Sequence, residues 1–115
     1  MALIVRQLFT PTVLPTGAAG VIFTVPADAP TFTLKNGRVR LTNTDPNPSI
    51  VSMYAGAPAL PSNTTTMFFP NVTIGPLTSI DVDLPTMSAG DTLRVICNRA
   101  NTVTMHEMGG VLHYT

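Results

Sequence analysis

The chain has 115 residues, of which 44% are hydrophobic and only 10% are charged, and six basic and six acidic residues cancel to a formal charge of zero. This length predicts a single domain over residues 1–115, with a charged fraction well below the roughly 25% of ordinary soluble domains. Phosphate binding requires clustered Lys and Arg, so the neutral balance excludes nucleic acid as a partner.

Prolines punctuate the whole chain and separate runs that are rich in Val, Ile, Thr and Phe. Proline fixes φ and lacks an N–H donor, so it interrupts helices and central strands. Extended segments are predicted at residues 2–10, 21–25, 31–34, 38–43, 49–55, 79–84, 92–98 and 111–114, with shorter pieces at 66–69, 71–74 and 102–105. About eight or nine short antiparallel strands at this spacing predict an all-β, single-domain β-sandwich or jelly roll.

Period-two alternation assigns the inward positions of these strands. The predicted core residues are Val39, Leu41, Ile80, Val82, Leu93, Val95 and Cys97. Thr92, Arg94 and Ile96 are expected on the opposite face of their strand. Asn36-Gly37 is the strongest hairpin signal in the chain, because both residues tolerate the positive φ of a type I′ turn. It predicts a tight turn between residues 34 and 38.

Residues 57–76 are predicted to form an irregular loop, because the stretch is proline-rich and uncharged. It carries Met67, Phe68 and Phe69. Adjacent residues on a strand point to opposite faces, so the two rings are not expected to enter one core. Aromatic anchors dominate interface energies. These three residues are therefore predicted to contact a partner, the alternative being that they belong to the core.

Two pairs of opposite charge share the same spacing: Arg38 and Arg40, and Asp81 and Asp83. Residues i and i+2 of a strand lie on one face, so the pairs are expected to meet across a sheet or across a subunit boundary. All four are assigned to the predicted partner interface. Two carboxylates are too few for a hard-cation site, which requires six or more oxygens, so no metal and no cofactor is predicted.

The remaining reactive side chains do not form a catalytic pattern. His106-Glu107 lacks the second histidine at the spacing of a zinc protease, since His113 follows seven residues after His106. Cys97 lies among apolar inward positions and is expected to be a buried small hydrophobe. A single cysteine excludes an internal disulfide and suits a reducing compartment. The chain is therefore not expected to be an enzyme.

No apolar run approaches the ~20 residues that span a bilayer, and the N-terminus has no basic segment ahead of its apolar residues. Neither a membrane contact nor a signal peptide is predicted. A weakly charged, neutral surface favours association with other proteins. The alternative is a monomer whose surface is polar but uncharged.

Three segments carry recognisable sequence motifs: VIFTVPA at 21–27, VRLTNTD at 39–45 followed by a strand at 50–54, and MSAGDTLRV at 87–95 followed by a strand at 102–104. Together they resemble small bacteriophage structural proteins of the head decoration (cement) or tail type. The resemblance implies a sandwich or jelly-roll module that trimerises and has no active residues.

From this resemblance we expect a capsid decoration protein, made in the host cytoplasm and located on the capsid surface of the virion. Its expected partners are copies of itself, as a homotrimer, and the major capsid protein or another virion protein. A phage tail, fibre or head–tail connector module is the first alternative. A sugar-binding β-sandwich is the second, although the chain has no Trp and only two Tyr, Tyr54 and Tyr114, to serve as platforms.

Overall fold

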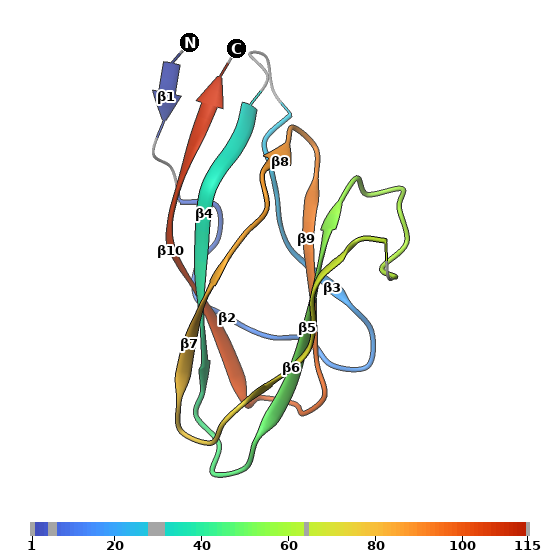
Figure 1. Ribbon diagram of the computed structural model, residues 1–115, viewed down its shortest axis with the longest axis vertical. Helices are drawn as coiled ribbons and strands as arrows, with labels where there is room; N and C mark the ends of the chain where they lie inside the picture. Colours follow the sequence, from blue (N-terminus) through green and yellow to red (C-terminus); the bar gives the residue numbers. More distant parts are fainter. Residues whose placement is uncertain (1, 5–6, 28–31, 64, 115) are drawn as a thin grey trace.

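The computed structural model describes residues 2–4, 7–27, 32–63 and 65–114, which contain strands and turns but no helix. The strands are β1 (Ala2–Ile4), β2 (Thr12–Val13), β3 (Gly20–Thr24), β4 (Phe32–Asn43), β5 (Ser49–Gly56), β6 (Met67–Ile74), β7 (Ser79–Asp83), β8 (Met87–Ser88), β9 (Thr92–Cys97) and β10 (Val103–Tyr114). They form two antiparallel sheets that face each other (Figure 1). The predicted all-β sandwich of short antiparallel strands is confirmed.

One sheet, called sheet A here, has the order β1-β10-β4-β7, with β2 pairing with β10 and β8 pairing with β4. The other, sheet B, has the order β3-β9-β5-β6. The chain crosses repeatedly between the sheets, from β4 to β5, from β6 to β7 and from β9 to β10. Each sheet is therefore assembled from distant parts of the sequence.

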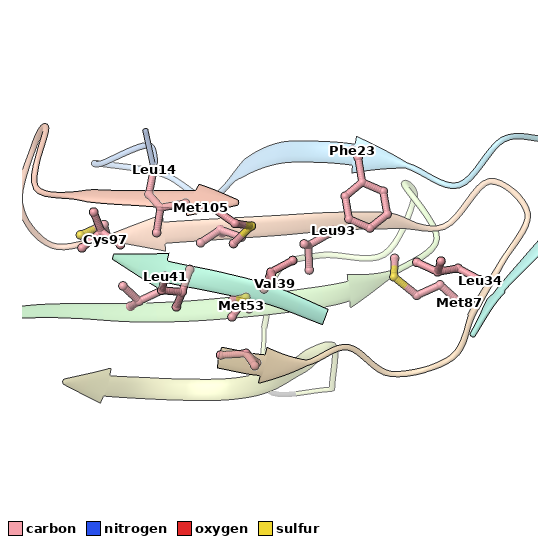
Figure 2. Packing of buried hydrophobic residues seen from close by; sticks show 14 of the residues in the cluster. Leu14, Phe23, Leu34, Val39, Leu41, Met53, Met87, Leu93, Cys97 and Met105 are labelled. Atoms are coloured by element: carbon pink, nitrogen blue, oxygen red, sulfur yellow. The ribbon is translucent and has the colours of Figure 1, made fainter. Parts of the chain in front are cut away.

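The core lies between the two sheets, where side chains from both meet (Figure 2). Leu41 of β4, Met53 of β5 and Leu93 of β9 are fully buried there. Of the predicted core positions, Val39, Leu41, Val82, Leu93, Val95 and Cys97 are buried, whereas Ile80 is half-buried at the sheet margin. The alternation pattern located this core correctly because each of these strands faces solvent on one side only.

The hairpin predicted at Asn36-Gly37 is wrong, because β4 runs without interruption from Phe32 to Asn43. Asn36 does take a positive φ of 57°. The partner strand β10 accommodates it with register shifts on both sides of Gly109. A Cβ on Gly110 would lie only 3.2 Å from the Cα of Gly37, so the two backbones touch at the bend. The Asn-Gly signal thus produces a bulged bend in a long strand instead of a turn.

Three other boundaries differ from the prediction. The strand expected at 2–10 is short, since β1 ends at Ile4 and residues 5–6 lie outside the described part. The short strand β2 forms at residues 12–13, where no strand was predicted. The pieces expected at 102–105 and 111–114 are the single strand β10. Residues 28–31, which include the start of the strand predicted at 31–34, also lie outside the described residues.

The irregular loop predicted at 57–76 ends at Thr66, because β6 is one strand through Pro70. Pro70 is tolerated because β6 is an edge strand that pairs only with β5. Two register shifts along this pair place extra residues in β6. The strand is therefore continuous but doubly bulged.

Candidate interaction surfaces

The predicted charge pairs meet across sheet A. In the register of β4 and β7, Arg38 faces Asp83 and Arg40 faces Asp81. Arg38 Nε lies 2.9 Å from Asp83 Oδ1, and Arg40 binds Asp81 with two hydrogen bonds, Nε to Oδ1 at 2.8 Å and Nη2 to Oδ2 at 3.2 Å. The pairing within one sheet is thus realised. That the same residues contact a partner stays a prediction.

The ion pair between Arg40 and Asp81 shifts the pKa values of both side chains. The hydrogen bond and the charge of Arg40 hold the pKa of Asp81 below its usual value of 3.8. Asp81 in turn raises the pKa of Arg40. Both side chains are about two-fifths exposed, so the pair lies in a strongly screened setting. Its main effect is to fix strand register and keep this face hydrated.

Both rings of the Phe68–Phe69 pair pack against the core, contrary to the expectation that they could not share it. Met53 of β5 faces Phe69 whereas the next residue, Tyr54, faces Met67, so Phe68 is an extra residue in β6. A bulge suspends strict alternation and lets neighbouring side chains lean to the same side. Both rings are half-buried, and Met67 is half-buried beside Tyr54.

The outer face of sheet B carries apolar side chains, of which sequence analysis assigned only Met67 to a partner contact. Val21, Arg94, Tyr54 and Met67 form a row across β3, β9, β5 and β6. Ile96 and Ile50 extend this row on the same face, and Val21 and Ile50 are 55% and 40% exposed. We call Val21, Ile50, Tyr54, Met67 and Ile96 the sheet B patch. The outward position of Ile96 opposite the buried side of β9 was the available signal for it.

Arg94 is the only charged residue in the four strands of sheet B. Its guanidinium donates to the carbonyl oxygens of Pro58 at 2.6 Å and Leu60 at 2.7 Å. Residues 58–60 are thereby fastened to Arg94, which lies between Val21 and Tyr54 in the row, and Ala55 N donates to Thr66 O. The positive charge is satisfied by carbonyls of its own chain, so the patch presents no free charge.

The reactive side chains that the structure describes, Cys97, His106 and Glu107, each take a separate place in the fold. Cys97 is a free thiol, 1% exposed, as predicted for a core position. Glu107 accepts hydrogen bonds from the backbone N–H groups of Leu8 at 2.8 Å and Phe9 at 3.4 Å, which attaches the N-terminal segment to β10. His106 faces Arg40 on sheet A, and its buried Nδ1 atom has no hydrogen-bond partner. In the described part of the chain, no three His, Cys, Asp or Glu residues are grouped so as to hold a metal.

A cavity of about 400 Å³ lies at the bend of β4. Asn36, Arg38, Asp83 and Thr86 contribute to its lining, together with Leu84 and Met108. Its charged groups, Arg38 and Asp83, are already paired with each other. The described residues that line it include no histidine, cysteine or lysine.

No protein-family profile matches this chain, and no curated protein is similar to it. Over the residues that the structure describes, no helix is long and apolar enough to cross a membrane. The surfaces described above, together with the sequence, are therefore the basis for a functional interpretation.

Proposed function

We propose that this chain is a non-enzymatic structural protein that acts through contacts with other proteins, as a capsid decoration (cement) protein on a phage head. The observation that carries the proposal is the sheet B patch. Its side chains are apolar and outward-facing, and its one neighbouring charge, Arg94, is occupied by loop carbonyls. Outward apolar side chains grouped on one face are a liability in a free monomer and are typical of a protein interface.

The arrangement of the polar groups supports the same conclusion. Ion pairs and half-exposed charges gather on sheet A, which leaves sheet B as the face to be covered. A decoration protein has this requirement, because one of its surfaces is covered by other protein, either neighbouring copies or the shell, while another stays in solvent. Residues 21–27, 39–45 and 87–95 resemble phage head and tail proteins, and this resemblance supports a phage particle as the structure to which the chain binds.

Cryo-electron microscopy of virions from the virus that encodes the chain tests this proposal. Many copies spread over the capsid surface, with sheet B facing other protein and sheet A facing solvent, are the expected result. A single ring at one vertex contradicts decoration and favours the tail or connector alternative. Absence of the chain from purified virions contradicts both.

A further inference from the structure

Leu77 is conformationally exceptional. In the described residues, four non-glycine residues have a positive φ: Asn36, Asn71, Asn101 and Leu77, the last at 53°. Asparagine visits this region readily because its short polar side chain bonds locally, whereas a leucine Cβ crowds the following carbonyl oxygen. The chain thus uses asparagine at three such positions and a strained residue at the fourth.

The strained leucine gains nothing from its own fold. Its side chain is 70% exposed, the highest value among the exposed large hydrophobic residues. It follows Pro76 in the turn between β6 and β7, at the position where type II turns place glycine or asparagine. A leucine that is both strained and solvated is unfavourable for the isolated chain, and such outliers cluster at functional sites.

The turn presents this side chain rigidly. Leu77 N donates to Asp45 O at 3.2 Å, and Asn43 N donates to Thr78 O at 2.9 Å. Thr78 Oγ1 donates to Gly75 O at 2.7 Å. Residues 75–78 contain no charge, and the nearby Asp45 is paired with Arg99. The turn therefore holds Leu77 as a fixed, uncharged protrusion, called the knob here, which loses little conformational entropy on binding.

We propose that Leu77 is an anchor that seats on the sheet B patch of a second copy of this chain. Each copy carries one apolar knob and one apolar face free of unsatisfied charge, so a one-to-one contact covers both. The other surfaces fit a leucine less well. The outer face of sheet A carries the ion pairs of Arg38 and Arg40, and charged and polar groups line the cavity at the β4 bend.

A knob and a patch at different places on the chain make a heterologous contact, which closes into a ring when the rotation between copies allows. This inference deepens the proposed function, because it supplies the self-contact of the expected homotrimer. The test uses the purified chain alone. If the chain self-associates through Leu77 but is absent from virions, the decoration role is refuted and the Leu77 contact stands. If the chain is found on virions but does not self-associate through Leu77, the Leu77 contact is refuted and the decoration role stands.

Sedimentation velocity on the wild type and Leu77→Asn provides the first measurement. The substitution is expected to weaken self-association at least tenfold, roughly the loss of a modest hot spot. In monomeric samples it is expected to raise Tm by about 2–5 °C, because asparagine relieves the strained φ. Leu77→Gly is expected to behave in the same way. Val13→Asn is the control, because Val13 is also an exposed apolar residue, at 49%, but lies on β2 of sheet A.

A mixing experiment tests the identity of the receptor surface. Leu77→Asn keeps an intact patch, whereas Val21→Lys keeps an intact knob. Each variant alone is expected to be monomeric, and their equimolar mixture is expected to form a heterodimer with one intact contact. A monomeric wild type, wild-type association of Leu77→Asn, or a mixture that stays monomeric would each overturn the proposal.

Discussion

The two sheets of this sandwich differ sharply on their outer faces. The outward positions of sheet A's strands hold five charged residues, Lys35, Arg38, Arg40, Asp81 and Asp83, whereas the strands of sheet B hold Arg94 alone. Both sheets have a buried inner face, so core formation does not explain the difference. Charged side chains lie mainly on one outer face. This distribution is expected when that face remains in solvent and the other is covered.

The ion pairs of sheet A are not the source of the fold's stability. Solvent screening leaves exposed ion pairs with little net stabilisation, whereas a fully buried aliphatic side chain contributes about 1.5–3 kcal/mol. The comparison therefore separates two roles. The inner faces stabilise the fold, and the outer faces determine which partners it binds.

The largest expected effect comes from placing charge on the inner side of sheet B. Val95→Asp puts a carboxylate at a position that is fully buried, and an isolated buried ion costs several kcal/mol against a net stability of ~5–15 kcal/mol. We expect the variant to be insoluble or unfolded by circular dichroism. Val21→Asp, on the outer side of the same sheet, is expected to fold. Cooperative melting of Val95→Asp would show that the assigned inner face is wrong.

Breaking the connection between the sheets is expected to have the next largest effect. Asn43, fully buried at the end of β4, donates through Nδ2 to the carbonyls of Asn47, Ile74 and Gly75. Its Oδ1 accepts from Asp45 N at 2.9 Å. Asn43→Ala removes all of these hydrogen bonds, so a loss of about 2–4 kcal/mol in the free energy of unfolding is expected. Urea denaturation measures it, with Asn47→Ala as the exposed control; equal small losses would contradict the bridging role.

The difference between the outer faces is tested by matched valines. Val21 lies in the sheet B patch and Val13 on sheet A, at 55% and 49% exposure. Val21→Lys is expected to weaken assembly at least tenfold, because lysine would be buried beside Arg94 under the partner. Val13→Lys is expected to have no effect. Sedimentation velocity compares the two, and equal behaviour would remove the distinction between the faces.

The smallest effect is expected for the titration of sheet A. The pKa of Asp81 is lowered in the folded protein by its hydrogen bond to Arg40. A depressed folded-state pKa contributes stability above the unfolded value of about 3.8, and that contribution is lost as pH falls through the folded pKa. Asp81→Asn should therefore flatten the fall of Tm at acidic pH, and high salt should shrink the difference between the variants. A fall of Tm identical in both proteins would rule this contribution out.

Local pattern in the sequence determined the class of fold and much of its content. Alternation in residues 38–43, 79–84 and 92–98 identified strands and their buried sides, because a strand that faces solvent on one side must alternate. The spacing of the two arginines and the two aspartates predicted that they would meet. These features depend on the chain within a few residues, so they can be read without knowing the neighbouring strands.

Only the tertiary structure decided what depends on a partner strand. Asn36-Gly37 bends a strand instead of ending it, because β10 brings Gly109 and Gly110 against it from 70 residues away in the sequence. Phe68 and Phe69 share the core because pairing with β5 forces a bulge in β6. The sheet B patch likewise exists only because strands from distant segments align their outward residues. Strand pairing depends on residues that are far apart in the sequence, so a local sequence pattern does not predict it.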